Sequence, residues 1–328
     1  MTLRRLAGLL ALLAAALGYL AFRIARPYRS FSDVTYLDFA RGTATSEIGR
    51  QLANAGVVSS RLDFFLARLV SRSRSLQAGE YRFDQPASAL EVAGRIARGD
   101  VFYVELVVPE GKNMFDVAQM AEQLGAFPAG AFLAAARNPA MIRDLDPAAP
   151  TLEGYLFPST YRIDHSTTPE RLCRVMTERF REEWRKLPRG ADVHRTVTLA
   201  SLVEREGKLA DERPVIAAVF ENRLRRGMKL DCDPTTIYAA LLEGRYRGTI
   251  YRSDLASDQP YNTYRHAGLP PGPIANPGVA SLKAVLSPAV SEALYFVRRP
   301  GDSGAHEFSS TIAQHEAATA RYRRGLQR

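Results

Sequence analysis

Residues 198–207 read TLASLVEREG, and this stretch gives the first indication of chemistry in the chain. In a helix, Leu199, Leu202 and Val203 share one face with Glu206, at the i, i+3, i+4 and i+7 spacing of a buried stripe. Glu204 and Arg205 are expected to point away from this face, to solvent. The pattern predicts a helix whose apolar face ends in a carboxylate.

The place of Glu206 on the apolar face suggests a general acid. An ionised carboxylate is costly to bury, so its pKa should rise, and a carboxyl that is protonated near neutral pH can donate a proton to a reacting bond. Two structural alternatives fit the same pattern. Glu206 could be a solvated residue at a fraying helix end, or the partner in an ion pair of the fold. Periodicity by itself does not choose among these three.

Two helices are expected after this stretch. Asp211 can cap one that has Pro214 in its first turn and ends at Gly227. Asp233 comes before Pro234, the order typical of a cap followed by proline at the first helical position. Asp233 is therefore interpreted as the cap of a helix over residues 235–242 rather than as an acid.

A long Gly/Pro-rich loop follows, reading YNTYRHAGLPPGPIANPG over residues 261–278. An exposed Tyr261 and Asn262 would suit stacking against sugar rings and hydrogen bonding to them. The same composition also suits a purely structural Ω-loop. Asn276, before Pro277, is expected to start the next helix.

Residues 31–110 have the pattern of a small module. The order of elements is β-α-α-β-α-β, and it predicts an α+β binding module without a catalytic cluster. Its second helix, capped by Ser59 or Ser60, carries Leu62, Phe65, Leu66 and Leu69. The strands are expected near residues 34–40, 79–83 and 101–108, and the other helices near 46–55 and 88–99, the last capped by Ser88 and ended by Gly99. After the module, Asn113 is expected to cap a helix that runs through Leu124.

The N-terminal segment decides the compartment. Residues 6–22 form an uncharged apolar run, LAGLLALLAAALGYLAF, preceded by Arg4 and Arg5. The run is long for a signal peptide and no small-x-small cleavage site follows it, so we expect a single-pass anchor rather than a cleaved signal. The N-terminus would then be cytoplasmic and the body extracytoplasmic. The expected organisation is residues 1–30 as stub and anchor, 31–110 as the module, 111–150 as a helical link and 151–328 as a larger domain.

Composition limits the functional classes. The chain has 328 residues, 46% of them hydrophobic and 24% charged, as in globular proteins. Its net charge is +9, but the basic residues are scattered and no nucleic-acid motif appears, so no nucleic-acid partner is expected. His306 and His315 have no third ligand at metal spacing, and we expect neither a metal nor a cofactor. Cys173 and Cys232 are expected to be small buried residues, although they could pair in an oxidising compartment.

A series of strings, in this order, resembles the YceG-like endolytic murein transglycosylase family over nearly the whole chain. The strings are GEYRF (79–83), PEG (109–111), LEGYLFPSTY (152–161), LASLVEREG (199–207), VFENRLRRGMKLDCDPTTIYA (219–239), YNTYRHAGLPPGPIANPG (261–278), LYFV (294–297) and HEF (306–308). The resemblance implies an α+β fold with an N-terminal transmembrane helix, a LysM-like first module and a larger catalytic domain with a lytic-transglycosylase-type cleft.

The resemblance also implies the reaction. That family cleaves the β-1,4 bond between N-acetylmuramic acid and N-acetylglucosamine within peptidoglycan strands and leaves a 1,6-anhydro end, a lyase reaction. Its catalytic glutamate matches Glu206, the residue that the helical face selects. Glu206 would protonate the glycosidic oxygen and then remove the proton from the muramoyl 6-hydroxyl as it attacks the anomeric carbon. The enzyme would thereby end the elongation of nascent strands.

Other site residues and some departures follow from the same resemblance. The residues expected to line or brace the cleft are Glu153, Asn222, Asp233, Tyr261 and Asn262. Ser159 stands where the family often has Asp, Asp231-Cys232 replaces Gln-Ser or Gln-Thr, and residues 314–316 read QHE instead of Glu-His-Asn. None of these departures affects Glu206.

Two rival functions remain open. A hydrolytic muramidase would need a second carboxylate, for which Glu153, Glu204 and Asp233 are the candidates. A non-catalytic scaffold that binds the cell wall fits the anchor and the first module equally well. In each case the expected setting is the inner membrane, with the body in the periplasm, peptidoglycan strands as the partner, and membrane-bound peptidoglycan synthases as neighbours.

Overall fold

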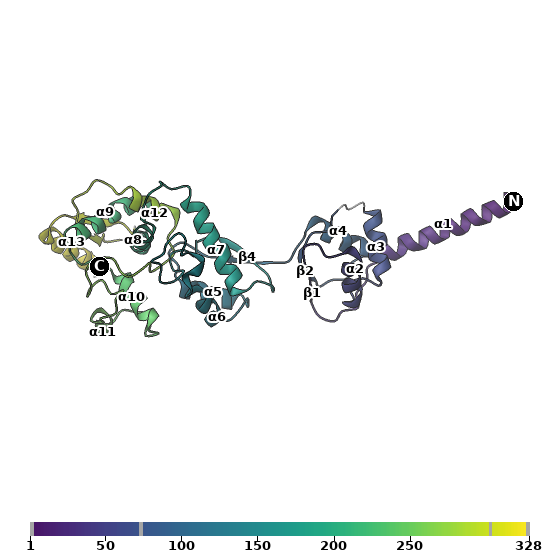
Figure 1. Cartoon of the computed structure of the whole chain (residues 1–328), viewed down its shortest axis with the longest axis horizontal. Helices are drawn as coiled ribbons and strands as arrows, with labels where there is room; N and C mark the ends of the chain where they lie inside the picture. The colour runs from purple at the N-terminus through teal and green to yellow at the C-terminus, as the bar shows by residue number, and fades with distance from the viewer. Residues whose placement is uncertain (1–2, 72–74, 302–303, 326–328) are drawn as a thin grey trace. The chain divides into compact units, whose positions relative to one another are not determined.

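The computed structural model describes residues 3–71, 75–301 and 304–325 (Figure 1). The chain divides into two compact units, Met1–Val104 (unit 1) and Glu105–Arg328 (unit 2). Both units combine helices with two-stranded sheets, which confirms the predicted α+β class.

Unit 1 begins with α1 (Leu3–Ala25), a helix with exposed apolar side chains. Its stretch Ala7–Ala25 is long and apolar enough to cross a membrane, and only 6% of this stretch is buried within the protein. A core helix of a soluble protein would bury such residues. The helix is therefore consistent with a single-pass membrane anchor.

The rest of unit 1 packs three helices against one two-stranded antiparallel sheet. Strands β1 (Thr35–Phe39) and β2 (Gly79–Phe83) pair antiparallel, with Thr35 opposite Phe83. The helices are α2 (Thr45–Asn54), α3 (Arg61–Val70) and α4 (Ala89–Arg98). The predicted caps are confirmed: Ser60 accepts a hydrogen bond at the start of α3, Ser88 forms a capping box with Glu91, and Gly99 ends α4 at φ 72°.

Two features of the first module differ from expectation. The third strand, β3 (Val104–Val107), pairs with β4 (Thr160–Ile163) and not with β1 or β2. Most of the apolar side chains predicted on α3 also do not pack, and of these only Leu66, which is partly buried, contacts the core. Phe64 and Ala67 are fully buried, whereas Leu62, Phe65 and Leu69 are exposed to 65%, 53% and 68%.

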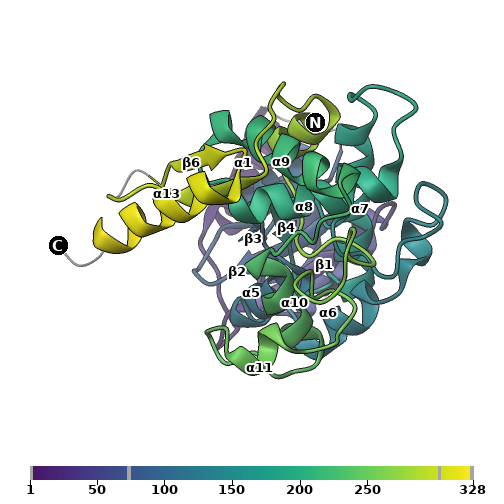
Figure 2. The same cartoon turned by 90° about the vertical axis from the view of Figure 1, so that its left-hand side faces the viewer.

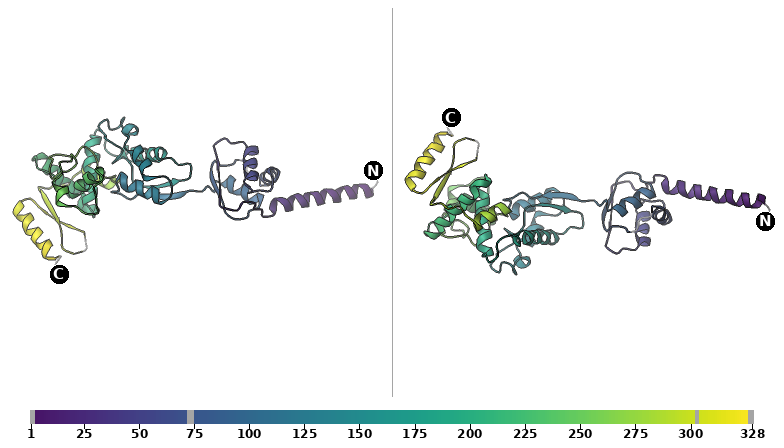
Figure 3. Two further views of the ribbon diagram at one scale, coloured as in Figure 1. Left: turned by 90° about the horizontal axis from the view of Figure 1, so that it is seen from below. Right: turned by 90° about the horizontal axis from the view of Figure 1, so that it is seen from above.

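Unit 2 is built around α8 (Val193–Glu206), which lies between α9 (Arg213–Arg225) and α10 (Asp233–Leu242) (Figure 2). Its core contains Leu199, Leu202, Phe220 and Tyr238. Strands β5 (Tyr295–Arg298) and β6 (His306–Ser309) pair antiparallel and project with α13 at one edge of the unit (Figure 3). The remaining helices are α5 (Met114–Gln123), α6 (Ala129–Ala136), η1 (Pro139–Met141), α7 (Pro169–Trp184), η2 (Ala210–Glu212), α11 (Arg252–Leu255), α12 (Val279–Leu286) and α13 (Ile312–Gly325).

Candidate active site

Glu206 is the last residue of α8 and lies in the wall of an open pocket. Leu199, Leu202 and Val203 are fully buried, which confirms the predicted stripe, and Glu206 continues it while staying partly exposed. The pocket has a volume of about 400 Å³. Its lining residues are Glu206, Phe220, Arg223, Leu230, Asp231, Cys232, Asp233, Tyr264, Tyr295, Phe296, Ile312 and His315.

The surroundings of Glu206 favour the protonated carboxyl. Burial raises its pKa above the ordinary value, and the negative charge of Asp233 raises it further. Three groups act in the opposite direction and lower this pKa: the Cys232 thiol, which donates a hydrogen bond to Glu206 Oε1 at 3.3 Å, and, more weakly, His306 and Arg205, which interact electrostatically with the carboxyl. Because burial and the neighbouring Glu206 also hold the pKa of the thiol well above its usual range, Cys232 remains a protonated donor.

The two cysteines have different surroundings. Both are free and buried, so the structure does not pair them. Cys173 lies on the buried face of α7, and burial raises the pKa of its thiol to about 12. Cys232 is more than a small apolar residue, because its sulfur contacts the carboxylate of the candidate acid. The expectation that the departure at Asp231-Cys232 leaves Glu206 unaffected was therefore wrong.

Glu204 does not point to solvent, so this prediction was wrong. Its carboxylate accepts hydrogen bonds from Arg213 Nη2 at 2.7 Å and from the Gly278 N–H at 3.0 Å, and its side chain is 4% exposed. Arg205 is exposed as expected and donates to the Gly111 carbonyl. Glu204 therefore ties α8 to the start of α9 and to the segment before α12.

Asp233 lies at the pocket and not at a cap position. The cap of α10 is Cys232, and Asp233 is the first helical residue. Its Oδ1 accepts a hydrogen bond from the Tyr264 hydroxyl at 2.6 Å. Asp211 is likewise not a cap, because it lies in η2 and α9 is preceded by Glu212 without a side-chain cap.

Tyr261 and Asn262 are buried, so the expected exposed platform for sugar rings is absent at these two positions. Tyr261 is 8% exposed and its ring packs on Tyr238, with the centroids 5.1 Å apart. Asn262 Nδ2 donates to three backbone carbonyls, those of Asp254, Leu255 and Ser257. These contacts support the structural interpretation of the loop, which the sequence left open.

Glu153 and Asn276 form a buried junction away from the pocket. Glu153 accepts hydrogen bonds from the Met114 N–H, at the start of α5, and from Asn276 Nδ2 at 3.0 Å. Burial raises the pKa of Glu153 to about 8. Asn276 also accepts from the N–H groups of Gly154 and Leu156, and it does not start α12, whose cap is Gly278.

Asn222 braces the chain that enters β5. Its Nδ2 donates to the carbonyls of Ser291 and Ala293, at 2.8 and 2.9 Å. It lines a different hollow, with Pro288 and Val290, and not the pocket of Glu206. Of the five residues predicted around Glu206, only Asp233 lines its pocket.

Several pocket residues were not predicted. Tyr264 contacts Asp233, and Arg223 lies over the ring of Tyr295 at 5.1 Å while its Nε donates to the Leu294 carbonyl. The ring of His315 stacks on the ring of Tyr295, with the two centroids 5.1 Å apart. Tyr264, Arg223 and Tyr295 lie within the strings that carry the family resemblance, and His315 is the histidine of the segment 314–316; this resemblance was the signal for them.

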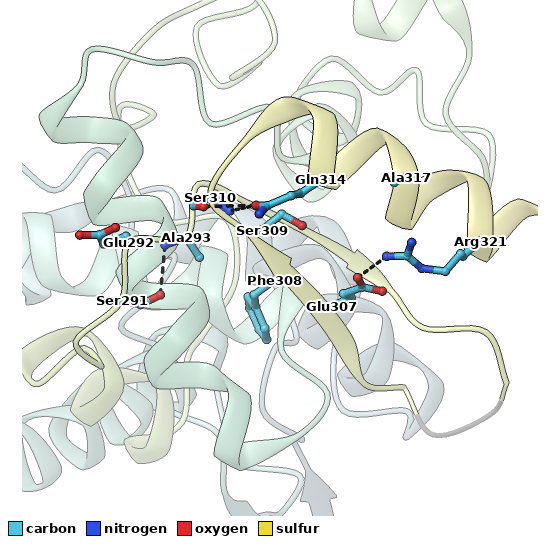
Figure 4. Close-up of a pocket in the computed structure, with 10 residues that line it drawn as sticks. All are labelled: Ser291, Glu292, Ala293, Glu307, Phe308, Ser309, Ser310, Gln314, Ala317 and Arg321. Atoms are coloured by element: carbon cyan, nitrogen blue, oxygen red, sulfur yellow. Dashed lines mark hydrogen bonds and ion pairs between the residues drawn. The ribbon is translucent and has the colours of Figure 1, made fainter.

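A second hollow of about 580 Å³ lies on the β5–β6 hairpin and α13 (Figure 4). Glu307 and Arg321 form an ion pair across it, and Gln314 accepts hydrogen bonds from Ser310. Each of these groups is already paired. This hollow presents no carboxyl comparable with Glu206, which lies in the other pocket.

Comparisons with known proteins assign the family. The model of the YceG-like family matches residues 37–321. The endolytic murein transglycosylase of Bacillus subtilis is 30% identical over 87% of this chain and 84% of its own length. That of Streptococcus pneumoniae D39 is 31% identical over 78% of this chain, which spans about half (52%) of the relative.

A solved structure gives the same result. The 2.6 Å crystal structure of a YceG-like protein from Listeria monocytogenes matches with a TM-score of 0.57 and 28% identity, over 87% of this chain and 99% of that chain. The match of sequence and of fold extends across both units. The chain belongs to the YceG-like family.

Proposed function

We propose that this chain is an endolytic peptidoglycan lytic transglycosylase in which Glu206 is the catalytic acid and base. It cleaves the β-1,4 bond between N-acetylmuramic acid and N-acetylglucosamine within a strand. The observation that carries the proposal is a carboxyl of raised pKa at the end of α8, in the wall of an open pocket. The names of the curated relatives supply the reaction and the substrate.

The reaction needs one carboxyl. Protonated Glu206 gives its proton to the glycosidic oxygen as the bond to the anomeric carbon breaks, and the charge of the sugar develops as an oxocarbenium ion. Ionised Glu206 then takes the proton of the muramoyl 6-hydroxyl, whose oxygen bonds to the anomeric carbon. Glu206 is again protonated, and the products are a free 4-hydroxyl and a 1,6-anhydro end.

The residues around Glu206 divide into two roles in this proposal. Asp233 and Tyr264 line the pocket and adjust the charge around Glu206. Asn222, Asn262, Tyr261 and Glu153 hold the segments that form the pocket. The hydrogen bonds of the two asparagines and of Glu153 to backbone groups, and the packing of the Tyr261 ring, support the second role.

The setting is also part of the proposal. The apolar α1 supports a single-pass anchor in the inner membrane, with residues 1–30 as stub and anchor and the body in the periplasm. Residues 31–110 form a LysM-like module that holds glycan, 111–150 link it, and 151–328 form the catalytic domain with a cleft for the strand. In that position the enzyme cuts nascent strands beside membrane-bound synthases and ends their elongation.

The test is mass spectrometry of peptidoglycan digested by the full chain. We expect 1,6-anhydro ends, and Glu206→Gln should lower cleavage by roughly 10²–10⁴-fold while the protein folds and binds strands. Glu178→Gln, on the exposed face of α7, is the matched control and should cleave at the wild-type rate. Wild-type cleavage by Glu206→Gln would refute the role of this residue.

The same digest distinguishes the transglycosylase from the rival hydrolytic muramidase. Of the three candidate second acids, Glu204 is tied to Arg213 and Glu153 is buried at the α5 junction, but Asp233 lies in the pocket of Glu206. A muramidase that used Asp233 would leave reducing ends instead of anhydro ends. If the wild-type digest contains reducing ends and these ends disappear in the digest by Asp233→Asn, the muramidase hypothesis replaces the transglycosylase proposal.

A further inference from the structure

Helix α3 of unit 1 has an apolar face that the protein leaves uncovered. Leu62, Phe65 and Leu69 follow one stripe of the helix and are exposed to 65%, 53% and 68%, and Val70 beside them is exposed to 62%. The opposite face, with Phe64 and Ala67, fills the core of the unit. Each large apolar side chain left in water forgoes about 1.5–3 kcal/mol of burial, so such a stripe marks a surface that contacts something.

The end of α1 is fixed to α3. Ile24 of α1 belongs to the core of unit 1, and Arg23 Nη2 pairs with Asp63 Oδ2, in the first turn of α3, at 2.8 Å. Asp63 is 2% exposed, whereas the Arg23 side chain keeps 38% of its surface exposed, so the pair lies at the edge of the core. The packing of α1 on α3 therefore sets where the apolar stripe lies relative to the membrane span.

With α1 as the anchor, the apolar stripe of α3 lies at the level of the membrane surface. The span Ala7–Ala25 ends where α1 packs on α3. Figure 1 shows α3 at the side of unit 1 from which α1 emerges, and the axis of α3 runs across that of α1. A helix at this level lies among the lipid headgroups if α1 crosses the bilayer. Interfacial helices have this character: an apolar face toward the acyl chains and cationic side chains at the headgroups.

The polar residues around α3 match a lipid surface. A hollow of about 540 Å³ at the end of α1 is lined by Tyr19, Phe22, Arg23, Arg26, Pro27, Tyr28, Arg29 and Ser59. Arginine attracts lipid phosphate, and tyrosine is enriched at the boundary between headgroups and acyl chains. The exposed Arg61, at the start of α3, extends the cationic rim.

We propose that the Leu62–Phe65–Leu69 face of α3 is inserted into the membrane surface next to α1, as a second membrane contact of unit 1. Two contacts with the membrane fix the rotation and tilt of unit 1, whereas a single membrane-spanning helix followed by a hinge would leave both free. Unit 1 then presents the same side to the periplasm at all times. This proposal rests on α1 being the anchor, as proposed above.

The test uses the full chain in lipid vesicles. Trp184→Phe removes the one natural tryptophan, and Phe65→Trp or Leu69→Trp adds a probe on the α3 face. Lipids brominated in their acyl chains quench a tryptophan that reaches them. We expect strong quenching at positions 65 and 69. Tyr36→Trp is the matched control on β1, which lies on the side of unit 1 away from α1, and should be quenched several-fold less (Figure 1).

A second variant separates insertion from mere nearness to α1. Leu62→Gln with Phe65→Gln should reduce the quenching of the tryptophan at position 69 to the level of the control. If positions 65 and 69 are not quenched in wild-type background, or if position 69 stays quenched with both glutamines present, the proposal is wrong. Flotation of every variant with the vesicles tests the anchor separately, since a chain without an anchor would not float at all.

Discussion

The thiol of Cys232 lies 3.3 Å from Oε1 of Glu206 and donates a hydrogen bond to it. By the family resemblance Ser or Thr is more usual at position 232, so this chain has a weaker donor beside the candidate acid. A donor to the carboxylate favours the ionised form, whereas burial and Asp233 favour the protonated form. The pKa of Glu206 is therefore set by a balance that single substitutions can shift in either direction.

The first prediction concerns the donor. Cys232→Ala removes the hydrogen bond, so the pKa of Glu206 should rise and the alkaline limb of the pH profile should move to higher pH. Cys232→Ser replaces the thiol with a stronger donor and should move this limb to lower pH. The measurement is kcat/KM for strand cleavage between pH 4 and 9. Identical profiles for all three proteins would show that Cys232 does not influence the acid.

The second prediction concerns charge at the pocket. Asp233→Asn removes the negative charge that raises the pKa of Glu206, so the alkaline limb should move to lower pH. Tyr264→Phe deletes the hydroxyl that donates to Asp233 but keeps the charge, and it should not produce this shift. The pair separates electrostatics from geometry. A shift of equal size and direction in both variants would contradict a role for the charge.

The third prediction concerns the loop after residue 261. Asn262 is fully buried, and its amide holds three carbonyls. Asn262→Ala removes these three buried hydrogen bonds and should lower the free energy of unfolding by about 1–3 kcal/mol or more. Chemical denaturation measures this change, and the activity per folded molecule should remain high. Lost activity at unchanged stability would instead indicate that Asn262 binds substrate.

The fourth prediction concerns pH and stability at Glu153. The folded protein keeps this proton up to about pH 8, whereas the unfolded chain releases it near pH 4.5. Unfolding between these values releases a proton, so stability should fall as pH rises, by about 1.4 kcal/mol per pH unit from this group. Glu153→Gln should remove this slope. The difference in unfolding free energy between variant and wild type, measured at pH 5 and pH 8, checks it. Parallel pH curves would show that Glu153 is ionised in the fold.

The sequence alone determined most of the local elements and the position of Glu206 at the end of an apolar stripe. Caps at Ser60, Ser88 and Asn113, and the helical stripe that ends at Glu206, depend on neighbours within one or two turns, and the structure confirms them. Local hydrogen bonds and periodicity are present in any short segment, so they can be read before the chain is folded.

The tertiary structure alone decided the partners of these elements. Cys232 and Glu206 are 26 residues apart, Glu204 meets Gly278 across 74, and β3 pairs with β4 rather than with the strands of unit 1. Burial of Tyr261 and Asn262 likewise depends on segments that pack over them. Such contacts follow from how whole elements pack, and no local pattern specifies them. The sequence therefore placed Glu206 at the end of the apolar stripe, whereas the fold determined which groups surround its carboxyl.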